Sequence, residues 1–378
     1  MTVPPTPDPV FLEFLQNLSS VIQPQEGVVL VLRGSLLLRH WFGEQARAAA
    51  DIDLECFRQV PAGQHSRFAT AVSHGRALCA WAMYEGREVQ FQESEDGGES
   101  LWDYESPGER FFLDWSWAKE GSSGQMQIDI AAAIRPLNDV PVADVGLTGS
   151  DGACFQFPAY TPEMMLAAKL SWLLRSFTRR NDGGRRSLHW HGDPKDLFDA
   201  HLLLTKPCLR ADEFQRALLT VGVDDKLDFN NLQAIFDVRH GLIADAGFGN
   251  WPAFEKQHQA IIHASPTGMM QNIADRLEPL LGDFYRAEEM PFWLAINAGP
   301  IDEAALLVYA DWLEERGDKR AGYLRLFIQV YFHESDLPRQ DRAWKRGLLN
   351  QALRTPSPWL CQAFGSAPRL REISQKLK

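Results

Sequence analysis

Hydrophobic and polar positions in the first part of the chain predict helices and strands that follow one another closely. Residues 10–22 carry apolar side chains at helical spacing, which predicts a helix. Residues 28–32 form an unbroken apolar run, which Arg33, Gly34 and Ser35 follow. Such a run is typical of a buried strand, and the pattern of residues 35–48 predicts that a helix follows it directly.

The next segments predict further strands on which acidic side chains share one face. In residues 51–57, apolar and acidic positions alternate, so that Asp51 and Asp53 point away from the apolar side. Residues 65–83 have a helical pattern, whereas the acidic stretch 92–108 is typical of a loop. Two further strand candidates, ERFFLDWSWAKE and QMQIDIAAA, flank EGSSG and predict a hairpin, with Asp129 opposite its apolar neighbours.

From about residue 160 the pattern becomes mostly helical. Thr161 and Pro162 have the chemistry of a helix start, and a second change comes near residue 288. From residue 290 onward the net charge is +3, whereas the rest of the chain carries −15. We therefore expect three parts: an α/β core in residues 1–159, a helical domain in 160–287 and a small helical module in 288–378.

Composition narrows the class of protein. The chain has 378 residues, 45% of them hydrophobic, and a formal net charge of −12. Tight non-specific binding to a nucleic-acid backbone would favour a basic chain, so any such contact must be local. The five cysteines are widely spaced and form no CxxC pair, which argues against a disulfide framework and favours a cytoplasmic setting. No apolar stretch is long enough to span a membrane.

The main candidate site combines Gly34 and Ser35 with a pair of aspartates, Asp51 and Asp53. Small residues at a strand-to-helix turn let phosphate approach the backbone, and a helix N-terminus offers N–H groups and partial positive charge. Aspartates at i and i+2 on one strand face can bind Mg²⁺ or Mn²⁺ through oxygen. Asp129 is the candidate third carboxylate, which would let two metal ions lie side by side.

Later helices offer a second set of charged candidates. The neighbours of Lys169 one helical turn away in either direction are all apolar. A lysine in that setting needs an anion, such as a triphosphate, or must extend its ammonium group to solvent. In the segment KDLFD, Asp196 and Asp199 share a helix side, although Lys195 and Asp199 also have the spacing of a local ion pair.

A basic patch interrupts the acidic chain between these helices. It has the chemistry to meet an RNA backbone, but a solvated loop explains it equally well. The same stretch contains His189 and His191, which lack further metal ligands at a suitable spacing. The patch consists of Arg175, Arg179, Arg180, Arg185 and Arg186.

Four stretches together resemble the AbiEii family, the toxins of type IV toxin–antitoxin systems, within the polymerase-β-like nucleotidyltransferase superfamily. They are RGSLLLRHWFGEQARAAADIDLEC, QMQIDIAA, TPEMMLAAKLSWLLR and KDLFDAHLLL, and they span about residues 30–205. The resemblance implies an α+β fold, with a polymerase-β-like core of mixed sheet and flanking helices followed by a helical domain. It also implies an NTP substrate, a divalent metal and a cognate antitoxin protein.

The resemblance gives individual residues a role. Ser35 would hold nucleotide phosphate, Lys169 would contact the triphosphate, and Asp199 or Asp196 would fill the acidic position of the last motif. Arg47 falls where the family tends to have an arginine, whereas Ala49 replaces its usual Ser or Thr. The candidate catalytic residues are Asp51, Asp53, Asp129, Lys169 and Asp199; the candidate nucleotide-binding residues are Gly34, Ser35, Arg47, Lys169, Lys195 and Asp196; the candidate metal ligands are Asp51, Asp53 and Asp129.

The stretch around YADWLEERGD resembles a short helical repeat-companion domain that has no chemistry to carry over. The leading hypothesis is a metal-dependent nucleotidyltransferase. It would transfer NMP from an NTP to a hydroxyl group of RNA, tRNA or protein, as a growth-arresting or anti-phage toxin. Two alternatives stay open: a nucleotide-binding sensor or scaffold without catalysis, and a nucleotidyltransferase that modifies a small antibiotic.

Overall fold

The computed structural model divides the chain into two compact units, which are described separately. The first comprises Met1–Ala167, Thr205–Leu209 and Trp251–Ala264, and the second comprises Ala168–Leu204, Arg210–Asn250 and Ser265–Lys378. The three domain limits expected from the sequence stay predictions. The residues that the structure describes are 8–21, 28–58, 68–84, 88–94, 99–100, 108–133, 137, 140–182, 185–224, 232–237, 248, 250–282, 286, 288–297, 299–354, 358–364 and 367–376.

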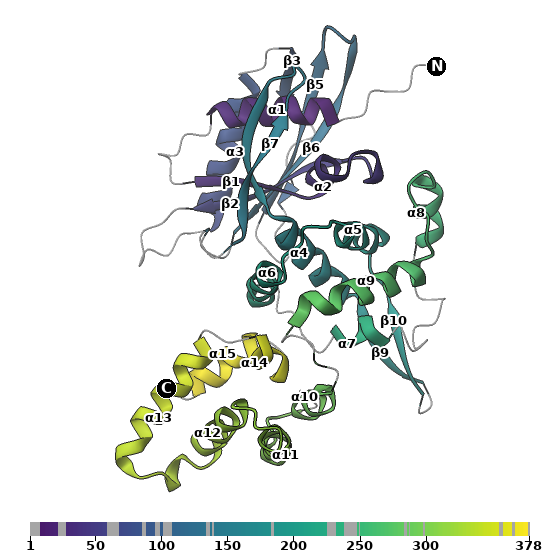
Figure 1. Ribbon diagram of the computed structural model, residues 1–378. Coiled ribbons are helices and arrows are strands. Elements are labelled where there is room, and N and C mark those ends of the chain that lie inside the picture. Colours follow the sequence, from purple (N-terminus) through teal and green to yellow (C-terminus); the bar gives the residue numbers. More distant parts are fainter. Residues whose placement is uncertain are drawn as a thin grey trace. The chain divides into compact units, whose positions relative to one another are not determined.

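A mixed β-sheet forms the centre of the first unit (Figure 1). Its strand order is β3-β5-β6-β2-β1-β8-β7, and β4 pairs with β5. Strand β2 runs parallel to β6 and antiparallel to β1, and β1 runs parallel to β8. The strands are β1 (Val28–Arg33), β2 (Asp51–Arg58), β3 (Val89–Glu93), β4 (Glu99–Ser100), β5 (Gly108–Trp117), β6 (Ser122–Ala132), β7 (Val142–Thr148) and β8 (Cys154–Tyr160).

Helices α1 (Asp8–Val21) and α3 (Phe68–Tyr84) pack against each other, and α3 lies along β2 and β6. Gly75 of α3 comes so close to the sheet that a Cβ atom there would contact Leu30, Cys56 and Ile130. These three side chains therefore mark the covered, apolar face of the sheet. Because side chains alternate along a strand, the aspartates of β2 and β6 point to the opposite face.

The helix that follows β1 is shorter than its sequence pattern suggests. Helix α2 covers Ser35–Phe42, and a 3₁₀ turn, η2 (Gly43–Gln45), replaces the continuation expected to residue 48. Gly43 adopts a φ of 55°, in the left-handed region that glycine tolerates and that ends a helix. The remaining residues, 46–50, lead directly into β2 without regular secondary structure.

Two hairpins differ from the sequence-based expectations. Strands β7 and β8 pair antiparallel in a region to which the sequence pattern assigned no strand. The polar stretch expected as a loop forms strands β9 (Phe177–Asp182) and β10 (Arg185–Trp190), which pair with each other in the second unit. Their backbone hydrogen bonds stabilise a hairpin whose side chains alternate too weakly in polarity to reveal it. The side chains of 178–189, which include most of the basic patch, lie outside the described residues.

The rest of the described chain is helical. Helix α4 (Pro162–Arg175) begins in the first unit, where the Thr161 hydroxyl accepts a hydrogen bond from the Met164 N–H at 3.2 Å, as expected for an N-cap. No helix among the described residues is long and apolar enough to cross a membrane. The other helices are α5 (Pro194–Leu204), α6 (Ala211–Asp224), α7 (Leu232–Asp237), α8 (Trp251–Gln257), α9 (Pro266–Leu281), α10 (Met290–Asn297), α11 (Glu303–Glu314), α12 (Arg320–Phe332), α13 (Arg339–Arg354), α14 (Pro358–Ala363) and α15 (Ala367–Lys376), with a 3₁₀ turn, η8 (Glu334–Asp336), before α13.

Candidate active site

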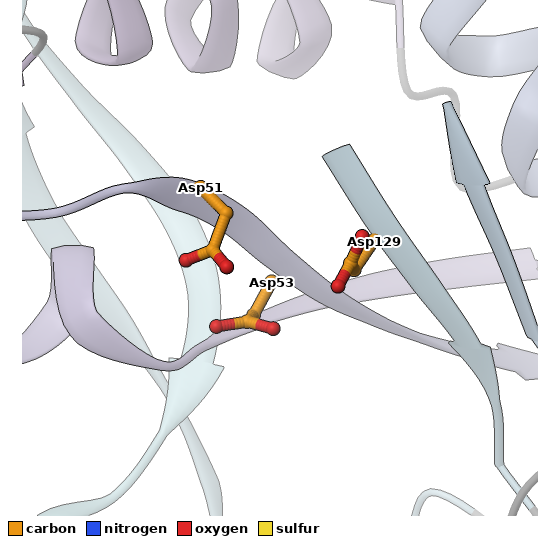
Figure 2. A group of neighbouring side chains, drawn as sticks. All are labelled: Asp51, Asp53 and Asp129. Atoms are coloured by element: carbon orange, nitrogen blue, oxygen red, sulfur yellow. The ribbon is translucent and has the colours of Figure 1, made fainter. Parts of the chain in front are cut away.

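Three carboxylates meet on the face of the central sheet opposite α3. Asp51 and Asp53 come from β2, and Asp129 comes from the neighbouring parallel strand β6, where it pairs in register with Asp53. Figure 2 shows the three side chains directed toward one another. One carboxylate oxygen of each lies within 4.8 Å of the others. We call these residues the aspartate triad; the sequence predicted its members, and the parallel pairing of β2 with β6 brings them together.

The turn between β1 and α2 lies against the triad. Gly34 has a φ of 81°, and a Cβ atom at this position would overlap the carboxylate of Asp53. The buried hydroxyl of Ser35 donates to Oδ1 of Asp51 at a donor–acceptor distance of 3.4 Å, a long hydrogen bond. Both residues therefore shape the carboxylate site. Helix α2 begins at this turn, so its first backbone N–H groups lie there. Gly34, its N-cap residue, provides no side-chain hydrogen bond to them.

Asp129 is held by two side chains to which the sequence analysis gave no role. Arg110 of β5 donates from Nε to Oδ1 at 2.9 Å and from Nη2 to Oδ2 at 2.8 Å. Gln127, two residues earlier on β6, donates from Nε2 to Oδ1 at 3.1 Å. Arg110 faces Asp129 because the two residues are cross-strand partners in the β5–β6 hairpin. If the turn of this hairpin is placed correctly in the sequence, the resulting register predicts that Arg110 lies opposite Asp129.

The same sheet face continues away from the triad with a fourth acidic residue. Glu55 follows Asp53 by two positions on β2 and is buried. Tyr160, at the end of β8, donates its hydroxyl hydrogen to Oε2 of Glu55. This hydrogen bond joins β8 to β2 across β1 and stabilises a buried carboxylate that would otherwise be costly. Arg47 is half-buried in the connection that leads into β2.

A second charged cluster lies in the other unit. The ammonium group of Lys169 on α4 is 2.9 Å from Oδ1 of Asp196 and 2.9 Å from Oδ2 of Asp199, both on α5. Asp199 is fully buried, and the Lys169 side chain is only 12% exposed. The protein thus supplies the anion that Lys169 needs, so its apolar neighbours alone do not indicate a triphosphate. Lys195 is about half exposed and pairs with Asp193 at 3.2 Å.

The chemistry of the triad fits a divalent cation. Carboxylate oxygens are the hard ligands that Mg²⁺ and Mn²⁺ prefer, and three of them converge here. Asp51 and Asp53 are partly exposed, so a cation can reach them, whereas Asp129 is 9% exposed and fixed from behind. Arg110 offsets one of the three negative charges, which leaves a group of carboxylates with an excess of negative charge.

Comparison with known protein families identifies a match for most of the chain. A model of the family described as "Nucleotidyl transferase AbiEii toxin, Type IV TA system" matches residues 18–288. This range contains all the sequence-predicted site residues. No curated protein matches the chain.

Two solved structures show a weak likeness. The first is JHP933 from Helicobacter pylori, with 11% sequence identity and a TM-score of 0.39, over 74% of this chain and 93% of that protein. The second, from H. pylori, is described as a candidate nucleotidyltransferase, with 12% identity and a TM-score of 0.37, over 71% and 92%. We draw nothing about function from likenesses of this size. The family match covers most of the chain, and the protein therefore belongs to the AbiEii family of nucleotidyltransferase toxins of type IV toxin–antitoxin systems.

Proposed function

We propose that this protein is a metal-dependent nucleotidyltransferase that transfers NMP from an NTP to a hydroxyl group of RNA. The observation that supports it most strongly is the convergence of Asp51, Asp53 and Asp129 beside the β1–α2 turn. In the reaction, a bond forms between the acceptor oxygen and the α-phosphorus of the NTP. The bond from that phosphorus to the pyrophosphate oxygen breaks, and pyrophosphate leaves. Family membership itself implies an NTP substrate and an antitoxin partner.

The triad would hold Mg²⁺ or Mn²⁺. When bound, such an ion lowers the pKa of a coordinated hydroxyl group and neutralises charge on the phosphates. The residues of the chain orient this chemistry: Asp129 is fixed by Arg110 and Gln127, and Ser35 supports Asp51. The uncapped N-terminus of α2 and Gly34 offer backbone N–H groups to the phosphates, because a glycine at the turn leaves the backbone accessible.

We also propose that Lys169 contacts the triphosphate, with Asp196 and Asp199 holding its ammonium group in place. Lys169→Met should weaken NTP binding at least about tenfold, because one charge-assisted contact is lost. Lys119→Met, which removes an exposed lysine paired with Glu88, serves as the matched control. Equal NTP affinity for both variants, measured by equilibrium dialysis on folded protein, would contradict this role. The predictions for Arg47 and Lys195 can be tested by the same binding measurement.

A transfer assay tests the main proposal. The full chain is mixed with Mg²⁺, each labelled NTP in turn, and bacterial RNA, protein or small-molecule acceptors. Label should enter RNA and should disappear with Asp51→Ala, because a metal ligand is removed. Asp144→Ala, at an exposed carboxylate on β7 of the same sheet, should keep full transfer. Label in protein or in a small molecule would reject RNA as the acceptor, and NTP binding without any transfer would reject the enzyme.

A further inference from the structure

The carboxylate of Asp129 is engaged before any cation arrives. Both of its oxygens accept hydrogen bonds from Arg110, at 2.9 and 2.8 Å, and Oδ1 also accepts one from Gln127 at 3.1 Å. This bidentate geometry is the strongest that arginine offers a carboxylate. The ion pair is largely shielded from water, with side chains 26% and 13% exposed. Asp129 therefore differs from Asp51 and Asp53, which are more accessible.

Arg110 belongs to a row of charged residues that crosses four adjacent strands. In register, Arg33 of β1 lies opposite Asp53 of β2, Asp53 lies beside Asp129 of β6, and Asp129 lies opposite Arg110 of β5. The row places an arginine at each side of the two central aspartates. Because guanidinium groups stay protonated at all accessible pH values, their charge is permanent. This fixed positive charge repels a cation that approaches the aspartates.

We propose that Arg110 is a positioning residue that fixes Asp129 toward the other two aspartates and, by its charge, limits how tightly the free protein binds a divalent cation. This inference rests on the proposed metal site. Arg110 uses lone pairs of Asp129 and offsets one of the three negative charges. A divalent cation at the triad therefore meets a smaller net negative charge than three aspartates alone would give.

Cation binding to the full chain without nucleotide measures this effect directly. Mn²⁺ is titrated into wild type, Arg110→Ala and Arg110→Lys, and free Mn²⁺ is followed by electron paramagnetic resonance. Arg110→Ala should bind Mn²⁺ at least about tenfold more tightly, because removing a unit charge about 6 Å from a divalent ion has this effect even in a water-like dielectric. Arg110→Lys keeps the charge and should stay within about twofold of wild type.

A matched control lies on the other face of the same sheet. Arg76 of α3 pairs with Glu109 and Glu93, so Arg76→Ala also removes an arginine from a carboxylate pair, but away from the triad. Its Mn²⁺ affinity should remain that of wild type. In transfer, Arg110→Ala should lower kcat despite its tighter cation binding, because Asp129 is no longer held in one orientation.

The outcomes separate this inference from the proposed function. If Arg110→Ala binds Mn²⁺ no more tightly than wild type does, and Arg110→Lys has the same affinity as Arg110→Ala, the role of the arginine charge is overturned. Mn²⁺ binding that survives in Asp51→Asn and in Asp53→Asn would instead overturn the metal site itself. If Arg110→Ala does not fold, as judged by circular dichroism, Arg110→Gln takes its place with the same expected direction.

Discussion

Two sites in this chain, one around a fully buried carboxylate and one with three carboxylates of which two are partly exposed, differ in how positive charge balances them. Glu289, just before α10, is fully buried and receives two hydrogen bonds from Arg320, at 2.9 and 2.7 Å, and one from the Tyr309 hydroxyl. Arg286 lies 3.5 Å away. In the aspartate triad, by contrast, three carboxylates converge, and Arg110 pairs with one of them, Asp129. In the Glu289 group, arginines compensate the negative charge, and the hydrogen bonds hold helices together. In the triad, an excess of negative charge favours the binding of a cation.

The position of each group in the fold supports this contrast. The partners of Glu289 come from α11 and from the start of α12, and Trp293 of α10 donates to the Tyr309 hydroxyl at 3.0 Å. Burial and Glu289 raise the pKa of Tyr309 far above its usual range, so its hydroxyl remains a donor. Each polar atom has a role in holding helices together. Removing a carboxylate should therefore have opposite effects on stability in the two groups.

The largest expected effect is on the Glu289 group. Glu289→Gln keeps the shape but removes the buried negative charge, and the free energy of unfolding should fall by about 3 kcal/mol. Urea denaturation followed by tryptophan fluorescence measures it. Glu315→Gln, at an exposed carboxylate 3.9 Å from Arg316, is the matched control and should change stability by less than about 0.5 kcal/mol. A loss for Glu289→Gln no larger than for this control would remove the contrast.

The triad should respond in the opposite sense. Asp51→Asn should slow nucleotide transfer at least about 100-fold, yet raise the melting temperature of the metal-free protein, because one of three repelling charges disappears. With saturating Mn²⁺ the order should reverse, since bound cation stabilises wild type more. Differential scanning fluorimetry with EDTA and with Mn²⁺ measures both signs. A lower melting temperature for the variant in EDTA would mean that the triad is not electrostatically strained.

A smaller effect is expected at the turn beside the triad. Gly34→Ala would be strained at a φ of 81°, and its methyl group would displace the Asp53 carboxylate, for a cost of about 2 kcal/mol and weaker Mn²⁺ binding. Gly43→Ala is a close control: Gly43, at the other end of α2, also has a positive φ of 55°, but a Cβ atom there would contact nothing. It should cost about 1 kcal/mol and leave Mn²⁺ affinity unchanged. Equal Mn²⁺ affinities for the two variants would exclude a contact between Gly34 and the site.

The smallest effect is expected from an exposed pair between the start of α11 and the end of α12. His333 Nε2 lies 2.5 Å from Glu303, and this hydrogen bond raises the pKa of His333 above its usual 6.5. The pair stabilises the fold fully below pH 6.5 and loses its effect as pH rises through the folded-state pKa. His333→Gln should therefore not change the melting temperature at pH 8.5. An NMR titration of the His333 ring that gives a midpoint at or below 6.5 would contradict the pairing.

Much of the fold was predictable because local patterns were strong. The helix before β1, the strands β1 and β2 and the helices α3, α4 and α5 agree with their apolar periodicity. The β5–β6 hairpin was expected with its turn at residues 120–124, which would place Trp115 opposite Asp129. The observed turn lies at 118–121, and Arg110 takes that position instead. A shift of a few residues in a turn changes every cross-strand partner, which is why Arg110 was missed.

The sequence by itself determined the chemistry of this protein: which acidic side chains share a strand face, where a glycine and a serine end a strand, and which family the motifs resemble. It did not determine partners that are distant along the chain. Tertiary structure decided that Asp129 lies beside Asp53, that Arg110 rather than solvent holds Asp129, and that Asp196 and Asp199 bind Lys169. Periodicity shows which side chains share one face of a strand or helix, whereas strand order, hairpin register and helix packing determine which residues each face contacts.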